Sequence, residues 1–327
     1  MTGFVETLRE AFGDRVQVGE PLAPLTTFKL GGPADVLLSL DRAEELQRAV
    51  TLARAQDVPV TVIGGGSNLL IADRGIRGLV IRVRGGEVRQ IGPARVRADA
   101  GLTINGLVRW TIAHGLASLE AWAGTPGTVG GAIYGNAHFH GRNISDHVEA
   151  VRLLSRDGRI SDVPVADMEF AYDYSRLHRT GEIVISADFE VMPGEPDRLR
   201  AVARDSLAYR KRTQPLAMPS AGCIFQNPVP GRDSVPEGIP WSAGALVDRA
   251  GLKGAREGQA HVSPTHGNFI VNEGNASAGE VRALIERCKR SVYREYGVQL
   301  REEIVSMGFD SAAGEAANPS TFESTED

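Results

Sequence analysis

The sequence lacks the features that mark most secreted, membrane-spanning and nucleic-acid-binding proteins. Its 327 residues include 2 cysteines, Cys223 and Cys288, which are too few for a disulfide framework and have no metal-ligand spacing. No segment approaches the roughly 20 consecutive apolar residues of a membrane span, and the acidic residues of MTGFVETLRE do not fit a signal peptide. No clustered basic face is visible, so nucleic acid is not an expected partner. We therefore predict a reduced, cytoplasmic protein with no membrane or nucleic-acid partner.

Length and charge predict about two domains and an acidic tail. Dividing the length by about 150 gives a prior of roughly two domains. The formal net charge is -5, yet residues 308–327 contain acids and neither Lys nor Arg, which leaves the rest of the chain nearly neutral. Because this end has little apolar surface to bury, we predict a disordered tail over residues 307–327.

Residue patterns predict helices interspersed with strands, and therefore an α+β fold. Helical patterns mark residues 41–56, 103–114, 197–211 and 277–296. Extended patterns mark 58–63, 78–83, 182–191 and 267–272, and Asp157-Gly158 lies at the centre of an expected hairpin. Cys288 belongs to the apolar stripe of the last helix, so we expect it in the core.

Two glycine-dense segments stand out. GGGSNLL, residues 64–70, follows a buried strand, and its unobstructed backbone N–H groups could converge on an anion such as a pyrophosphate. A tight turn that needs positive φ explains the same glycines equally well, and Leu69 breaks the G-x-G-x-x-G dinucleotide fingerprint. GTPGTVGGAIYGNA, residues 124–137, has few large side chains and could pack against a flat ring. Two such clusters in successive units predict a cofactor bound between them.

Three histidines, His138, His140 and His147, lie close together in the chain. No acidic or cysteine partner at a recognised metal spacing accompanies them, so we predict no metal site. We place them instead in a polar loop near the ligand.

Seven segments, taken in order, resemble a known enzyme family. They are TTFKLGGPAD (26–35), IGGGSNLL (63–70), GTPGTVGGAIYGNA (124–137), PSAGCIFQNP (219–228), SAGALVDRAGLKG (242–254), HGNFIVN (266–272) and LREEI (300–304). Together they resemble the flavin-dependent UDP-N-acetylenolpyruvoylglucosamine reductases of bacterial cell-wall synthesis. The chain is similar to the shorter subclass, because no room remains between EIVISADFEV and PSAGC for an extra substrate-covering loop.

The resemblance implies an FAD held without covalent attachment between two subdomains of the fold shared with vanillyl-alcohol-type oxidases, plus a third α/β domain for substrate. We accordingly expect an N-terminal helix in 1–20, FAD-binding subdomains in 21–83 and 84–195, and a substrate-binding domain in 196–306. By the same resemblance, the residues that cradle the pyrophosphate are Gly64, Gly65, Gly66, Ser67, Asn68 and Leu69. Those that line the flavin ring are Gly124, Thr125, Pro126, Gly127, Thr128, Gly130, Ala132 and Asn136.

The reaction implied is the NADPH-dependent reduction of UDP-N-acetylglucosamine enolpyruvate to UDP-N-acetylmuramate. NADPH reduces the flavin at N5, and the hydride then passes to the β-carbon of the enolpyruvyl group. Cys223 stands where the family has its proton-donating serine, and a thiol with a reference pKa of about 8.5 is mostly protonated at neutral pH. Inert packing is the alternative role for Cys223. Glu303 matches the family glutamate, whereas Glu302 is expected to be a surface carboxylate.

The main departure from the family pattern is Asp173, in YDYS, where the family has an arginine in Y-R-x-S. An anion there would oppose a developing enolate rather than stabilise it. Arg176 could take over the arginine's role from a helical turn but not from a strand, and a solvated surface arginine is the alternative.

Arg212, Gln226 and Asn227 are the candidates for binding the UDP moiety. A helix-end cation is the alternative role for Arg212. Two rival functions remain open at this stage. Asp173 motivates a catalytically impaired homologue that binds a UDP-sugar or flavin, and the fold also admits another flavin oxidase acting on a different small substrate.

Overall fold

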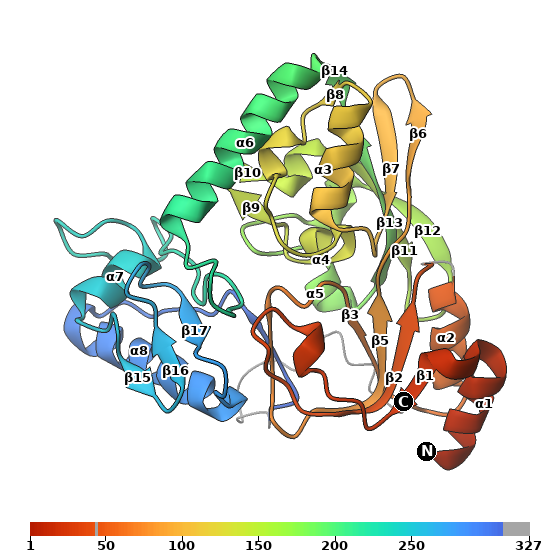
Figure 1. Cartoon of the computed structure of the whole chain (residues 1–327), viewed down its shortest axis with the longest axis horizontal. Helices are drawn as coiled ribbons and strands as arrows, with labels where there is room; N and C mark the ends of the chain where they lie inside the picture. The colour runs from red at the N-terminus through yellow and green to blue at the C-terminus, as the bar shows by residue number, and fades with distance from the viewer. Residues whose placement is uncertain (43–44, 310–327) are drawn as a thin grey trace.

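The computed structural model describes residues 1–42 and 45–309, which form three successive units (Figure 1). The first unit contains α1 (Thr2–Phe12), β1 (Val16–Val18), β2 (Ala34–Leu40), α2 (Glu45–Arg54), β3 (Val60–Ile63), β4 (Leu69–Ile71) and β5 (Ile76–Val83). Its sheet has the order β1-β2-β5-β3, in which β2, β5 and β3 are parallel and β1 is antiparallel to β2. α1 and α2 share a core with this sheet that includes Leu8, Leu46 and Leu79.

The second unit is built on a five-stranded antiparallel sheet of order β12-β11-β13-β7-β6. It contains β6 (Val88–Gly92), β7 (Arg95–Asp99), α3 (Ile104–Ala113), β8 (Leu116–Ala117), α4 (Val129–Tyr134), β9 (His138–Phe139), β10 (Arg142–Asn143), β11 (Val148–Leu154), β12 (Ile160–Pro164), α5 (Leu177–Thr180), β13 (Ile183–Glu190) and β14 (Met192–Pro193). α3 begins where the Thr103 side chain accepts a hydrogen bond from the Gly106 N–H. Leu107 of α3 and Phe189 of β13 lie in the same core.

Helix α4 is an element that the residue patterns do not predict, because it lies within the second glycine-dense segment. Thr128 begins it by accepting a hydrogen bond from the Gly131 N–H at 3.4 Å. Glycine weakens a helix in isolation, but here it permits close packing: a Cβ on Gly130 would lie 3.1 Å from the Ala100 Cβ. Tertiary packing therefore overrides the low helix propensity of this segment.

The third unit contains α6 (Pro196–Thr213), α7 (Ala243–Arg249), β15 (Arg256–Glu257), β16 (Ala260–Val262), β17 (Ile270–Asn272), α8 (Ala278–Tyr296) and β18 (Val305–Met307). Figure 1 shows α6 running from the second unit toward the rest of the third. Ser277 and Glu280 form a capping box at the start of α8. The apolar stripe of α8 is buried, including Cys288 at 1% exposed, which confirms its predicted core position.

Several contacts join the third unit to the first. β18 pairs in parallel with β4, with Val305 opposite Leu69. The Asp73 carboxylate accepts hydrogen bonds from the Ala278 and Gly279 N–H groups at 2.8 and 3.0 Å, so the first unit caps the start of α8. These contacts place the C-terminal segment of the third unit directly beside the first glycine turn.

The predicted helices and strands are confirmed in the described residues, with ends shifted by a few positions, and the hairpin at Asp157-Gly158 joins β11 to β12. The domain division stays a prediction. β1 lies in the segment expected to hold the N-terminal helix, and β18 crosses the expected boundary at 306. Residues 310–327, most of the predicted disordered tail, lie outside the described residues. None of the described helices combines the length and apolarity needed to cross a bilayer.

Candidate active site

A cavity of about 610 Å³ lies where the three units meet. Both glycine-dense segments line it, as do His138, Asp173, Arg210, Cys223 and Glu303. Its volume falls within the range of about 300–1,000 Å³ that is usual for ligand sites. A second hollow of about 680 Å³ lies between residues 250–252 and α8, and none of the predicted site residues lines it. We therefore place the site in the first cavity.

The first glycine turn faces the second across a very short distance. Gly66 has a φ of 64°, and a Cβ there would lie 2.2 Å from the Leu25 carbonyl oxygen. A Cβ on Gly65 would lie 2.8 Å from the Gly127 Cα. Only glycine permits both the left-handed conformation and this approach. The resulting cradle of small residues at the cavity wall suits the pyrophosphate and ring of an FAD.

Most of the predicted cofactor residues line this cavity. They are Gly64, Gly65, Gly66, Ser67, Asn68, Leu69, Thr125, Pro126, Gly127, Thr128, Gly130 and Ala132. Gly124 and Asn136 do not line it. The Gly124 N–H donates to the Asn105 Oδ1 at 2.7 Å, and Asn136 is buried, with its Nδ2 donating to the Ala171 carbonyl at 2.8 Å. In the structure these two residues therefore support the wall of the cavity.

The Ala171 carbonyl belongs to a tight turn that carries Asp173 into the cavity. Two backbone hydrogen bonds between Ala171 and Tyr174, of 3.0 and 3.2 Å, close the turn. Asp173 has a φ of 52°, in the left-handed region that few residues other than glycine adopt. Ser175, which directly follows the turn, is anchored by its hydroxyl group, which donates to the Tyr134 carbonyl at 2.6 Å. The surrounding hydrogen bonds thus hold Asp173 in an uncommon backbone conformation.

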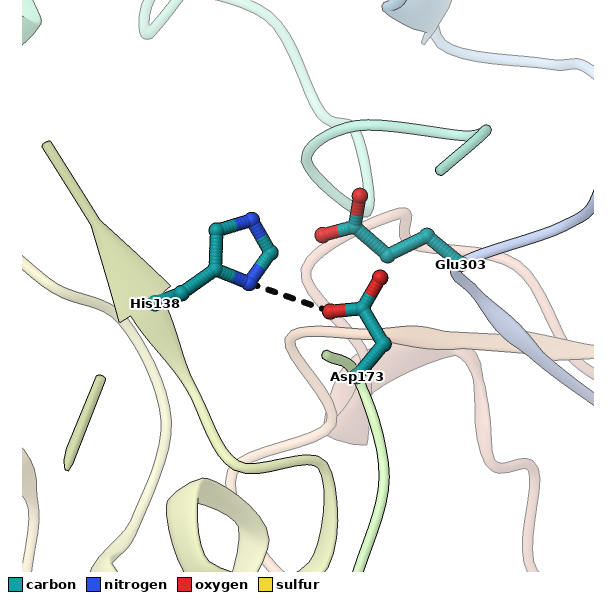
Figure 2. Close-up of side chains that lie close together, drawn as sticks. All are labelled: His138, Asp173 and Glu303. Atoms are coloured by element: carbon teal, nitrogen blue, oxygen red, sulfur yellow. Dashed lines mark ion pairs between the residues drawn. The ribbon is translucent and has the colours of Figure 1, made fainter. Parts of the chain in front are cut away.

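His138, Asp173 and Glu303 converge in this cavity from three separate segments (Figure 2). The His138 Nδ1 lies 3.0 Å from the Asp173 Oδ1, an ion pair whose two side chains are 27% and 10% exposed. The Glu303 carboxyl group lies beside both, and one side-chain ligand atom from each residue falls within 4.8 Å of the others. Asp173 Oδ2 is buried and has no hydrogen-bond partner among the described residues.

This arrangement sets the protonation of the cluster. Burial, followed by the negative charge of Asp173, raises the pKa of Glu303 to about 8, although His138 acts in the opposite direction. Burial disfavours a charged His138 ring, but the hydrogen bond to Asp173, the negative charge of Asp173 and, in its ionised form, Glu303 outweigh it and raise the pKa of His138. Near neutral pH, Glu303 therefore carries a proton, and its surroundings shift His138 toward the charged form relative to a free imidazole.

A histidine nitrogen and two carboxylates could also surround a metal ion, and within the described residues these three form such a group. Spacing patterns detect metal ligands only when these lie on one segment or on two neighbouring segments, and on that basis the sequence analysis predicts no metal site. Here each ligand comes from a different part of the chain. The absence of a metal thus remains a prediction, which metal removal can test.

Cys223 lies at the same cavity and carries a protonated thiol. Burial raises the pKa of Cys223, and the charges of Glu303 and Asp173 raise it further, against the opposing effects of Arg210 and Asn268. Asn268 also fixes the backbone that follows Cys223. Its Oδ1 accepts from the Phe225 N–H at 2.9 Å, and its Nδ2 donates to the Phe225 carbonyl at 2.7 Å. The site therefore contains a positioned proton source.

Arg210, rather than the expected Arg212, is the arginine of α6 that lines the cavity. Arg210 is buried, and its Nη2 donates to the Thr125 hydroxyl at 2.8 Å. Its guanidinium lies 3.7 Å from the centre of the Phe139 ring. Burial lowers the pKa of Arg210 to about 10, which leaves it charged at neutral pH. Arg212 is exposed and lies over Tyr209. The helical periodicity of α6 therefore directs Arg210, and not Arg212, toward the cavity.

Arg176 and Glu302 occupy other places than the sequence analysis assigns to them. The Arg176 guanidinium forms a two-pronged ion pair with Glu182, with both bonds at 2.8 Å, and it does not line the cavity. Glu302 is not a surface carboxylate, because its side chain is only 15% exposed and pairs with Arg282 at 2.7 Å and with Lys289. Glu182 lines the cavity but is neutralised by Arg176, and Glu302 pairs with its two cations outside the cavity.

The expected UDP-binding residues divide between the cavity and its surroundings. Asn227 lines the cavity, and its Oδ1 accepts from the Ala243 N–H at 3.0 Å at the start of α7. Gln226 does not line the cavity, although its backbone N–H donates to the Arg301 carbonyl at 2.9 Å. His138 and His140 both line the cavity, in agreement with the predicted polar loop, whereas His147 does not.

Two family profiles and several relatives match the chain. Residues 34–163 match an FAD binding domain, and residues 214–307 match the C-terminal domain of UDP-N-acetylenolpyruvoylglucosamine reductase. UDP-N-acetylenolpyruvoylglucosamine reductase 1 of Bacillus anthracis is 39% identical over 311 residues, which cover 94% of this chain and 100% of that protein. The reductase of Moorella thermoacetica is 38% identical over 310 residues, which cover 94% and 98%.

One solved structure is similar over most of its length. The crystal structure of UDP-N-acetylenolpyruvylglucosamine reductase from Thermus caldophilus superposes with a TM-score of 0.72 at 34% identity. The match covers 89% of this chain and 97% of that one. Together with the FAD-binding profile, it confirms the predicted α+β flavin-binding fold.

Proposed function

Because the chain belongs to the UDP-N-acetylenolpyruvoylglucosamine reductases, FAD-dependent oxidoreductases of peptidoglycan synthesis, we propose that it reduces UDP-N-acetylglucosamine enolpyruvate to UDP-N-acetylmuramate at the expense of NADPH. Bound FAD would supply hydride transfer from NADPH to the β-carbon of the enolpyruvyl group. The observation that carries the proposal is the convergence of the Cys223 thiol and the Glu303 carboxyl group in the cavity lined by both glycine turns.

The residues of the chain have four tasks in this reaction. The glycine turns hold the cofactor, because they expose backbone rather than side chains to it. Cys223 delivers its proton to the α-carbon of the substrate, and the resulting thiolate is reprotonated before the next turnover. Protonated Glu303 donates a hydrogen bond to the carboxylate on which negative charge develops. Arg210 adds a buried positive charge to the same wall.

NADPH consumption by the FAD-loaded protein tests this function. Under anaerobic conditions we expect continuous consumption with UDP-N-acetylglucosamine enolpyruvate and a single flavin reduction without it. A flavin that NADPH reduces once and the substrate never reoxidises would point to the impaired homologue. Rapid oxygen consumption by the reduced flavin, without any response to this substrate, would point to an oxidase.

A further inference from the structure

The pair formed by His138 and Asp173 has no part in the function proposed above, yet it lies at the centre of the cavity. His138 lies on β9, and Asp173 lies at the strained tip of the 171–174 turn. The two side chains are 27% and 10% exposed, so this ion pair is more buried than one on the protein surface. A buried aspartate held in this conformation is a candidate for a functional role rather than a solvated turn residue.

The geometry leaves one nitrogen of His138 available. Nδ1 is held by Asp173, whereas no hydrogen bond of Nε2 is found within the described residues. Figure 2 shows the ring edge that carries both nitrogens turned toward the two carboxyl groups. With Nδ1 donating to a carboxylate, a charged ring presents a second N–H at Nε2. Glu303, protonated as described above, offers a donor from the facing side.

The substrate of the proposed function carries a carboxylate, and the cavity must neutralise it. Arg210 donates one N–H to the Thr125 hydroxyl and lies over the face of the Phe139 ring, and its Nε is buried without a partner among the described residues. Arg176 does not line the cavity, and its guanidinium is already paired with Glu182. Asp173 and Glu303 are acidic, so His138 is the group in the cluster that can bring a positive charge to the substrate.

We propose that His138, as an imidazolium held by Asp173, binds the carboxylate of the enolpyruvyl group through Nε2, with Asp173 as its positioning residue. This inference rests on the proposed function for the identity of the substrate. Asp173 then serves the reaction although it is an anion. It fixes the orientation of the ring and favours its charged form, and the ring's positive charge stabilises the enolate-like species.

Ligand binding by His138→Gln gives the sharpest test. The FAD-loaded variant should bind UDP-N-acetylglucosamine enolpyruvate about 10- to 100-fold more weakly, which is the usual effect of losing one charge-assisted hydrogen bond. Its affinity for UDP-N-acetylglucosamine, which lacks the carboxylate, should not change. Flavin reduction by NADPH should also keep its wild-type rate. His114→Gln, on the exposed C-terminal end of α3, is the matched control.

Asp173→Asn provides an independent measurement in case the histidine variant folds poorly. It should weaken binding of the enolpyruvate compound selectively, and the double variant should bind no more weakly than His138→Gln alone, because Asp173 acts through His138. Unchanged affinity for the enolpyruvate compound in both single variants, or an equal loss for both ligands, would overturn the proposal.

Metal removal tests the remaining alternative, in which His138, Asp173 and Glu303 bind a metal ion. Wild-type protein treated with EDTA should keep its affinity and activity; loss that added Zn²⁺ or Mn²⁺ restores would show a metal site and refute the imidazolium role. The proposed function can fail separately. If the wild type binds the enolpyruvate compound but never consumes NADPH with it, the reductase activity is absent, and the comparison of affinities still decides the role of His138.

Discussion

The surroundings of Cys223 determine which of its protonation states is populated. Burial, followed by the carboxyl groups of Glu303 and Asp173, raises the pKa of Cys223 and favours the neutral thiol, and the positive charge of Arg210 only partly offsets these effects. A neutral thiol is a donor that delivers its proton only when negative charge develops beside it. The same surroundings would keep a serine hydroxyl neutral, so cysteine and serine should be interchangeable here.

Substitution of Cys223 should affect the second half-reaction alone. Cys223→Ser should keep turnover within about 10-fold, whereas Cys223→Ala should lose about 10²- to 10⁴-fold, the usual contribution of a general acid. NADPH should still reduce the flavin of the alanine variant. Anaerobic stopped-flow absorbance measures both half-reactions. Cys288→Ala removes the buried thiol of α8 and is the control; normal turnover of Cys223→Ala would exclude Cys223 from the mechanism.

Glu303 should make stability depend on pH. Its pKa in the folded protein, about 8, lies above the ordinary value of 4.5. Folding therefore retains a proton, and the stabilisation is complete below about pH 4.5 and lost as pH rises through about 8. Glu303→Gln is neutral at every pH, so its melting temperature relative to wild type should rise between about pH 5 and 9. A difference that stays constant across this range would contradict the raised pKa.

Among the elements, the two facing glycine turns impose a strict steric requirement at the cavity. Each turn is a tight connection by itself, but their contact at Gly65 and Gly127 makes side chains impossible at positions that a single turn would tolerate. The turns therefore act as one element, although they belong to different units. Displacing either turn should open the cradle.

Gly66→Ala tests this dependence. The new Cβ would meet the Leu25 carbonyl oxygen, so the turn must move and FAD binding should weaken by about 10-fold or more, the loss of one or two charge-assisted hydrogen bonds. Gly158→Ala is the control, because Gly158 also has positive φ but nothing lies within 4 Å of its Cβ position. FAD content and affinity after purification give the measurement. Equal FAD affinity in the two variants would show that the close approach is not required.

For the whole molecule, the contacts that hold the C-terminal segment position the active site. Glu303 lies between the Glu302 ion pairs and β18, which pairs with β4 of the first unit. The Asn68 Nδ2 donates to the Glu303 carbonyl at 3.0 Å. The position of Glu303 therefore depends on packing between the first and third units.

Glu302→Gln should destabilise the protein by about 1–3 kcal/mol, because it leaves Arg282 and Lys289 without their buried counter-charge. Urea unfolding at neutral pH measures this difference. Burial acts to raise the pKa of Glu302, but the hydrogen bonds and charges of Arg282 and Lys289 outweigh it and lower the pKa. The difference in unfolding free energy between wild type and variant should therefore shrink as pH falls and the wild-type carboxylate becomes protonated. Glu286→Gln is the control, because Glu286 contacts the same cations but is 42% exposed. Equal stability of the two variants would contradict the buried network.

The features that could be predicted from the sequence depend on short segments. Apolar periodicity located α8 and β5, Ser277 and Glu280 marked the start of α8, and the glycine turns and Cys223 belonged to motifs whose order identified the resemblance. Helix α4 could not be predicted in this way, because its stability comes from packing of Gly130 against Ala100 rather than from propensity.

The cluster of His138, Asp173 and Glu303 in the cavity was decided by the tertiary structure. His138, Asp173 and Glu303 lie far apart in the chain, and no spacing rule connects them; packing of β9, the 171–174 turn and the segment before β18 brings them together. The same packing selects Arg210 over Arg212 and directs Arg176 to Glu182. Turns and helices follow from interactions between neighbours in sequence, whereas protonation depends on every charge within a few ångströms, whatever its position in the chain.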